Sequence, residues 1–191
     1  MKPVGAALVG TGMWAGKIAA AVARTPALEL VTCFGRDAAR RAAFAAEVGC
    51  EAASSFETAV EDPRVEAVLL VTPNSTHAEQ AVACAERGRH VFVEKPIADT
   101  LEDGWAIREA CEAAGVTLLV GHGLRRLGAA RAVERLLAEG DPQDPVTLSF
   151  ELLDRGVRTR VGPLRDSALA SALQGPPPGP GELTLPRILQ T

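Results

Sequence analysis

The sequence lacks several features that mark particular classes of protein. It has no tyrosine, only 4% aromatic residues and a formal net charge of −4, with no block of lysine and arginine. Binding to nucleic acid or to an anionic membrane surface needs a basic patch, so neither partner is expected. The four cysteines, Cys33, Cys50, Cys84 and Cys111, show no CxxC spacing, which favours free thiols in a reducing cytosol.

The chain also lacks a long apolar run, and no spacing of its cysteines points to a metal site. Its amino-terminal stretch MKPVGAALVGTG is short and merges into a glycine turn. This stretch predicts neither a signal peptide nor a membrane span, and we expect the protein to be cytoplasmic. What the chain does have is 191 residues, 47% of them apolar, which is enough for one complete domain and a remainder.

Short apolar runs alternate with longer segments of helical periodicity over most of the chain. Strands are predicted at 5–9, 28–34, near Glu51, and at 67–71, 90–93, 117–120 and 146–152. Helices are predicted at 17–24, 37–48, from the capping signature 54–57 to about 62, and at 76–87, 101–114 and 129–139. This alternation indicates the α/β class, with a doubly wound parallel sheet of the Rossmann type covered on both faces.

The carboxyl-terminal stretch 153–191 differs from the rest of the chain. It has no sustained apolar period, and its GPPPGPG segment cannot form a helix or an interior strand because proline lacks the amide donor. We therefore expect an irregular tail rich in proline, glycine and arginine, with at most a short helix at 167–173.

A glycine-rich turn follows the first predicted strand and opens the first helix. It reads Gly10-Thr11-Gly12-Met13-Trp14-Ala15. In a dinucleotide-binding turn the first glycine permits the sharp bend, the second lets the backbone approach a pyrophosphate, and a small third residue allows close packing of strand and helix. The position of the motif within a βαβ unit favours dinucleotide binding over a turn with no ligand.

The end of the second strand bears on the choice of cofactor. An acidic residue that binds the NAD ribose is expected about 20 residues after the glycines. Here the chain reads Phe34-Gly35-Arg36-Asp37, with glycine in place of the carboxylate and an arginine beside it. Since a guanidinium suits a 2′-phosphate, we favour NADP over NAD. Arg36 could instead cover the adenine or be solvated, and Asp37 could be a helix cap.

Polar residues follow three further strands, and all should meet at one edge of a parallel sheet. They are Thr72-Pro73-Asn74 with His77, then Glu94-Lys95-Pro96, then the GHGLRR segment at 121–126. Lys95 could donate to a substrate hydroxyl or carbonyl beside a nicotinamide. His77 could be an exposed helix residue or a ligand, His122 a core histidine or a site residue. The Lys95–Pro96 bond is a candidate cis peptide.

Four segments together resemble the Gfo/Idh/MocA family of NAD(P)-dependent oxidoreductases. They are GTGMWA, FGRD, VTPNSTHAEQAVACAERGRHVFVEKPIADTLEDG and VGHGLRRLGAAR. The resemblance spans roughly residues 4–152. It implies hydride transfer between a nicotinamide cofactor and a sugar, cyclitol or similar polyol, with Lys95 as the catalytic lysine. The cofactor contacts that it implies are Gly10, Thr11, Gly12, Met13, Trp14, Ala15, Arg36, Thr72, Pro73, Asn74, His77, Glu94 and Lys95.

The family continues into a second, open-sheet α+β domain that carries a catalytic histidine. In this chain no histidine follows His122. We therefore expect a dinucleotide-binding domain at 1–124, the start of a truncated substrate domain at 125–152, and the tail at 153–191.

Three explanations of this pattern stay open. The chain could be a truncated or frameshifted product of impaired activity, a short form that binds NADP(H) without turnover as a regulatory module, or an enzyme that relies on Lys95 or His122 alone or on a partner. A second-domain strand left without its sheet exposes an unpaired edge, so we also expect poor solubility or a homodimer.

Overall fold

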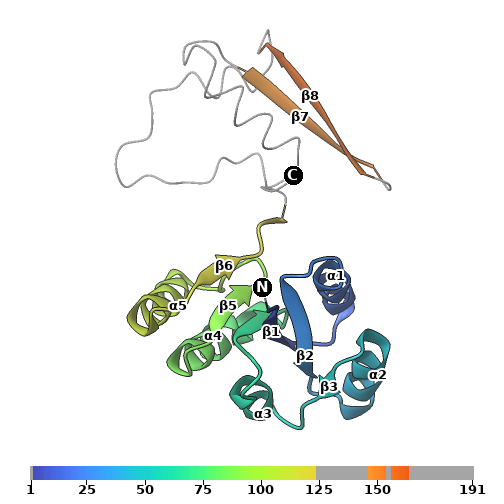
Figure 1. The fold of residues 1–191 in the computed structure, drawn as a ribbon. Coiled ribbons are helices and arrows are strands. Elements are labelled where there is room, and N and C mark those ends of the chain that lie inside the picture. The colour runs from blue at the N-terminus through green and yellow to red at the C-terminus, as the bar shows by residue number, and fades with distance from the viewer. Residues whose placement is uncertain (1, 124–145, 154–155, 164–191) are drawn as a thin grey trace. The chain divides into compact units, whose positions relative to one another are not determined.

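The structure is a computed structural model that describes residues 2–123, 146–153 and 156–163 (Figure 1). The chain divides into two units, Met1–His122 and Gly123–Thr191. The helices predicted at 129–139 and 167–173 lie outside the described residues. None of the helices in the described part of the chain combines the length and the apolar character needed to cross a membrane.

The first unit is built around a six-stranded parallel sheet, which confirms the predicted fold class. Its strands are β1 (Val4–Val9), β2 (Leu28–Phe34), β3 (Glu51–Ala52), β4 (Ala67–Leu70), β5 (His90–Val93) and β6 (Leu118–Val120). Their order is β3-β2-β1-β4-β5-β6. The chain steps outward from β1 to β3, then returns to β4 on the other side of β1, so the order reverses between β1 and β4.

Helices pack on both faces of this sheet and close two hydrophobic cores. They are α1 (Met13–Val22), α2 (Ala38–Val48), α3 (Phe56–Glu61), α4 (His77–Glu86), which follows the short 3-10 helix η1 (Asn74–Thr76), and α5 (Leu101–Ala114). Alternate side chains of β1 enter opposite cores. Ala6 and Leu8 pack with α1 and α2, whereas Ala7 and Val9 pack with α3, α4 and α5. A strand buried on both faces accounts for the continuous apolar run in the sequence.

Local capping chemistry sets most helix ends where the sequence predicts them. The side chains of Asp37, Ser55 and Thr100 accept hydrogen bonds from the backbone N–H of the third residue of α2, α3 and α5. Gly49 and Gly115 end α2 and α5 in the left-handed conformation, at φ of 76° and 67°. Glycine adopts these angles without the steric cost that a Cβ would bring.

Helix α1 starts and ends earlier than predicted. It spans Met13–Val22 rather than 17–24, because Gly12 is its N-cap and the residues after it already form the first turn. The glycine motif therefore lies on the helix as well as before it. The amides of this first turn point toward the carboxyl edge of the sheet.

The second unit contains a hairpin within its described residues. Strand β7 (Val146–Leu153) pairs antiparallel with β8 (Gly156–Pro163) along its whole length. The prediction of an irregular stretch from 153 on is wrong for β8, and β7 is not the lone strand that was expected. Backbone hydrogen bonds to a neighbouring strand stabilise an extended segment even where its own apolar pattern is weak.

Candidate functional site

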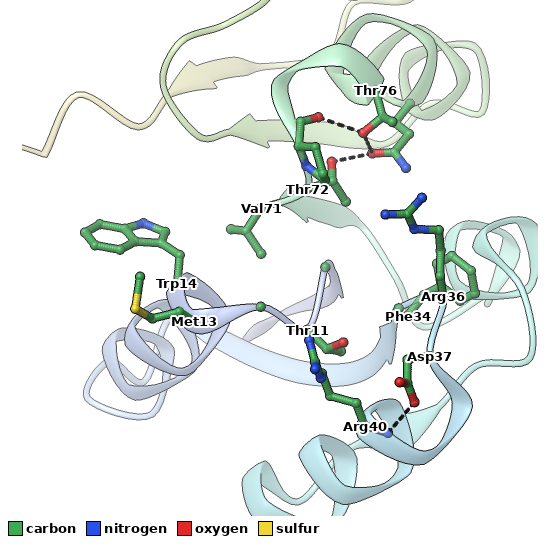
Figure 2. Close-up of a pocket in the computed structure, with 15 residues that line it drawn as sticks. Thr11, Met13, Trp14, Phe34, Arg36, Asp37, Arg40, Val71, Thr72 and Thr76 are labelled. Carbon is green, nitrogen blue, oxygen red and sulfur yellow. Dashed lines mark hydrogen bonds between the residues drawn. The ribbon is translucent and has the colours of Figure 1, made fainter.

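A crevice of about 660 Å³ lies at the carboxyl edge of the sheet, where the strand order reverses (Figure 2). The residues that follow β1, β2 and β4 line it. In open α/β sheets this switch point is where ligands bind, because the loops on either side diverge and leave room between them. The position alone therefore makes it the first candidate for a functional site.

The turn after β1 lets the backbone itself form one wall. Gly10 has a φ of 107°, and an added Cβ would lie 2.7 Å from the carbonyl oxygen of Val71. Its N–H donates to the carbonyl of Phe34 at 2.7 Å, which joins the ends of β1 and β2. A side chain at Gly10 would close the gap between β1 and β4, so the position requires glycine.

The start of α1 presents open backbone donors to the crevice. Gly12 is the N-cap, no side chain caps it, and the first turn holds no acidic residue. Free amides and the positive end of the helix dipole together suit an anion such as a pyrophosphate. Ala15 is fully buried, so this small residue serves the packing of strand and helix.

We call one group of residues the β2 side, namely Thr11, Gly35, Arg36, Asp37 and Arg40. Gly35 packs so tightly on the Thr11 side chain that an added Cβ would overlap it. In Figure 2, Arg36 projects toward the turn that carries Thr72 and Thr76, and Arg40 projects from α2 toward Thr11. Among the described residues, neither guanidinium makes a hydrogen bond or a salt bridge, so both are available to a ligand.

The backbone of the β2 side is braced from beneath. Arg41 donates from Nη1 to the carbonyl of Gly35 at 2.6 Å and lies over the ring of Phe34. Asp37 accepts from the backbone N–H of Arg40 at 2.9 Å, and this hydrogen bond lowers the pKa of its carboxyl group. Asp37 is thus a helix cap, one of the two roles considered from the sequence, while it also lines the crevice.

We call a second group the β5 side, namely Trp14, Thr72, His77, Glu94, Lys95 and Gly121. Within it, the hydroxyl of Thr72 donates to Oε1 of Gln80 at 2.6 Å, which fastens the turn after β4 to α4. The hydroxyl of Thr76 donates to the carbonyl of Pro73 at 2.8 Å and closes the same turn. The hydroxyls of this turn are therefore bound within the protein.

His77 is buried, contrary to the expectation that it lines the cofactor path. Its side chain is 0% exposed, with Nδ1 3.0 Å from the carbonyl oxygen of Pro96 and Nε2 3.0 Å from that of Thr72. A neutral imidazole donates to one of these carbonyls and an imidazolium to both. Both ring nitrogens face the main chain, so His77 ties the turn after β4 to the turn after β5.

The turn after β5 carries Glu94 and Lys95. The indole Nε1 of Trp14 donates to Oε1 of Glu94 at 2.6 Å, and the backbone N–H of Lys95 donates to Oε2 at 3.2 Å. The Lys95 side chain is exposed, and the Lys95–Pro96 peptide is cis, which confirms that expectation. His122 is exposed beyond β6, so its interpretation as a core histidine is wrong.

The predicted site residues thus separate into three sets. Those that line the crevice are Gly10, Thr11, Gly12, Met13, Trp14, Arg36, Thr72 and Pro73. Ala15 and His77 are buried, and the remaining four, outside the lining, are Asn74, Glu94, Lys95 and His122. Sequence reasoning named Gly35 and Gly121 within their motifs without listing either as a site residue, and it missed Arg40, Thr76 and Gln80. Arg40 follows Arg36 by four residues, a spacing that could have suggested a second guanidinium on the same side.

The described residues include no group of three or more histidine, cysteine or acidic side chains arranged to hold a metal ion. Cys33, Cys84 and Cys111 are buried and Cys50 is half-buried, and all four are free. Burial raises the pKa of the Cys84 thiol to about 12. These thiols lie in or against the hydrophobic cores rather than at the crevice.

A glycine turn, an uncapped helix N-terminus and free arginines at the switch point of a parallel sheet define a dinucleotide-binding α/β domain. A family model described as "GFO_IDH_MocA: Oxidoreductase family, NAD-binding Rossmann fold" matches residues 4–122. The chain belongs to this family, which confirms the resemblance drawn from its motifs.

Known proteins with similar sequences and structures are longer than this chain. The 1,5-anhydro-D-fructose reductase of Ensifer adhaerens is 38% identical over 140 residues, covering 73% of this chain and 42% of that protein. An NAD⁺-dependent scyllo-inositol 2-dehydrogenase of Bacillus subtilis is 36% identical over 138 residues, covering 71% and 40%. The WlbA dehydrogenase of Bordetella pertussis, solved with NADH and UDP-GlcNAcA, superimposes with a TM-score of 0.72 at 31% identity, covering 77% and 43%. The chain thus spans less than half the length of these relatives.

Proposed function

We propose that the protein is an NAD(P)-dependent oxidoreductase that transfers hydride between a nicotinamide cofactor and a sugar, cyclitol or similar polyol. The observation that carries the proposal is the crevice at the switch point, which the open N-terminus of α1 lines, together with an exposed lysine at the end of β5, the strand next to β4. The first feature suits the phosphates of a dinucleotide, and the second suits a substrate oxygen.

The residues present fit a dinucleotide. Gly10, packed against the carbonyl of Val71, would keep the turn tight, and Gly12, which has open space beside it, would let the pyrophosphate approach the amides of α1. Thr72 and Pro73 would flank the cofactor from β4, and Glu94 would contact it from the β5 side. When bound, the nicotinamide supplies or accepts the hydride.

The free arginines support a preference for NADP. Arg36 and Arg40 approach the crevice from the end of β2 and from α2, and the structure gives neither guanidinium a partner among the described residues. Gly35 has no carboxylate that would repel a phosphate. An acidic residue could not replace Gly35 without a shift, because its Cβ would overlap the Thr11 side chain. Two planar cations beside the ribose position would bind a 2′-phosphate. Names of two Bacillus subtilis relatives specify NADP⁺ and NAD⁺, so both cofactors occur in the family.

Lys95 is the residue that we assign to the substrate. Its ammonium group can donate a hydrogen bond to the oxygen of the reacting carbinol or carbonyl and stabilise negative charge that develops there. The polyol class rests on the names of relatives, among them 1,5-anhydro-D-fructose reductase and scyllo-inositol 2-dehydrogenase. Family members share the binding domain, and the substrate differs from one to another.

The test compares binding with turnover in the natural polypeptide. Calorimetry would measure the Kd values for NADPH and NADH, and absorbance would follow cofactor reduction by a panel of polyols. Lys95→Ala should lower kcat/KM by about 10²- to 10⁴-fold and change the Kd for NADPH less than about twofold. Lys2→Ala, a matched loss of an exposed lysine away from the crevice, should change neither. Tight NADPH binding with no turnover on any polyol would contradict the proposed oxidoreductase activity and would favour a non-catalytic NADP(H)-binding module.

A further inference from the structure

The carboxylate of Glu94 is held by three contacts that come from three parts of the fold. The indole N–H of Trp14, in the first turn of α1, donates to Oε1 at 2.6 Å. The backbone N–H of Lys95 donates to Oε2 at 3.2 Å. From the end of β6, Gly121 packs so closely that an added Cβ would lie 2.9 Å from Oε1 and 3.0 Å from the carboxyl carbon.

The contact between Trp14 and Glu94 connects distant parts of the sheet. The two residues are 80 positions apart, and β4 lies between β1 and β5 in the sheet order. The hydrogen bond therefore passes over the carboxyl end of β4. This contact depends on the tertiary fold, because no residue near Trp14 in the sequence supplies the acceptor.

The indole ring is kept in place by electrostatic contacts more than by burial. Trp14 is 41% exposed, and the ammonium of Lys17 lies 4.3 Å from the centroid of its ring. A cation over one face and a carboxylate at the N–H edge both match the charge distribution of an indole. The ring is thus oriented by the two charged groups that it contacts.

A carboxylate held in this way still has acceptor capacity for a ligand. Its two oxygens offer about four lone-pair directions, of which Trp14 and Lys95 use two. A free glutamate side chain loses rotamer freedom when a ligand orders it, and that loss weakens binding. Here the orientation exists before any ligand arrives.

We infer that Trp14 and Gly121 are positioning residues that set the Glu94 carboxylate for the nicotinamide end of the cofactor. Trp14 supplies the donor that fixes the direction of the carboxylate, and Gly121 supplies the space in which it lies. This inference rests on the proposed cofactor site. It assigns to the indole N–H a role that the ring alone cannot fill.

A spectroscopic test reads the hydrogen bond directly. The chain has two tryptophans, so a ¹⁵N–¹H spectrum contains two indole signals, and Trp105→Phe assigns them. The Trp14 N–H should resonate downfield and exchange slowly, and Glu94→Ala should shift it to the position of an exposed indole. The Trp105 signal, from a ring that is 46% exposed on α5, should stay unchanged. A Trp14 signal insensitive to Glu94→Ala would overturn the inference.

A binding test measures the functional consequence. Trp14→Phe, which keeps the ring and removes the donor, should weaken NADH and NADPH binding equally, by about three- to tenfold. Gly121→Ala should weaken both to a similar extent, since the methyl group displaces the carboxylate. In the Glu94→Ala background, Trp14→Phe should have no further effect, because residues that act through one another are not additive. Trp105→Phe is the control and should change neither Kd.

Other outcomes separate the inference from the proposed function. If the unmodified protein binds neither cofactor, the proposed function fails. If it binds them and Trp14→Phe binds equally well, or the two substitutions add, only the positioning role fails. Tighter binding by Trp14→Phe would mean that the indole competes with the ligand for the carboxylate, which also overturns the inference.

Discussion

The β2 side and the β5 side of the carboxyl edge are built on opposite principles. On the β2 side, Arg36 and Arg40 extend into the crevice without partners among the described residues. On the β5 side, both ring nitrogens of His77 and both carboxylate oxygens of Glu94 lie within hydrogen-bond distance of other protein groups. Free charges are suited to selecting a ligand by its charge, and fixed dipoles are suited to holding geometry.

This difference suggests how one fold serves both purposes. The exposed arginines can be substituted without loss of structure, because the backbone that carries them is held separately. Arg41 donates a hydrogen bond to the carbonyl of Gly35. The β5 side has no such separation, since its polar side chains themselves join the turns. Substitutions of Arg36 and Arg40 should therefore alter selectivity, and those of His77 and Glu94 should alter stability or the binding of both cofactors alike.

The largest effect is expected where the β5 side is broken, at His77. The His77 ring has two nitrogens, each 3.0 Å from a carbonyl oxygen, whereas the amide in His77→Gln has a single nitrogen, so its amide oxygen is left facing a carbonyl in a buried place. We expect a loss of about 3 kcal/mol in the free energy of unfolding, since a buried polar group without a partner is costly. Urea unfolding measures it, and the affinities for NADH and NADPH should fall together.

The matched control for this prediction is His122→Gln, which replaces an exposed histidine at the same edge. Its free energy of unfolding should stay within about 0.5 kcal/mol of the unmodified protein. If His77→Gln proved equally harmless, the two carbonyls would not depend on the imidazole. The proposed difference between the β2 side, with arginines unpaired among the described residues, and the β5 side, with hydrogen-bonded polar groups, would then lose its main support.

The next largest effect is expected on the β2 side, at Arg36. Arg36→Ala should raise the Kd for NADPH by about tenfold to a hundredfold and leave that for NADH nearly unchanged, because the two ligands differ only in the 2′-phosphate. Arg40→Ala should act in the same direction with a smaller effect. Calorimetry at two salt concentrations measures both, and higher salt should narrow the difference.

Arg108→Ala serves as the control, since it removes an exposed arginine that pairs with Glu112 on α5, outside the crevice lining. It should change the Kd for neither cofactor. Equal losses of NADH and NADPH binding in Arg36→Ala would contradict a 2′-phosphate role. The β2 side would then resemble the β5 side, since a substitution there would weaken the binding of both cofactors equally.

The smallest effect is expected at Asp37, which caps α2 beneath the free arginines. Its folded-state pKa is lowered by the hydrogen bond from the Arg40 N–H, so its contribution to stability is present above the unfolded pKa. That contribution is lost as pH falls through the folded pKa. Asp37→Ala should lower the melting temperature by about 3 °C at neutral pH. Calorimetric scans should show the difference shrinking in acid, and a constant difference at all pH values would argue against the cap.

The fold was predictable from the sequence to a large extent because its signals are local. The strand at Leu28–Phe34 and the helix at Leu101–Ala114 lie where apolar runs and capping residues predict them. Helix α1 was misjudged because Gly16, a weak helix former, lies inside it. Strand β8 was missed because its partner β7, not its own pattern, supplies the hydrogen bonds.

The site was predictable in its location and only in part in its contacts. Strand ends in a parallel sheet must meet at one edge, so Arg36, Thr72 and Lys95 could be placed there from sequence alone. That His77 would be buried between two carbonyls could not, since a histidine early in a helix has no sequence mark of burial. Gly121 was placed at the edge as part of the 121–126 segment, but its role could not be predicted, because the space that it leaves is filled by Glu94.

Residues a few positions apart therefore determined the order of strands and helices, the caps and the glycine turn, since each depends on backbone angles and hydrogen bonds within one short segment. Only the tertiary structure decided the contacts of Trp14 with Glu94, 80 positions away, and of His77 with Pro96, 19 positions away. Such contacts arise from the register of parallel strands and from the direction of each side chain at the edge. Neither quantity is encoded by nearest neighbours along the chain, because both follow from how the whole sheet packs.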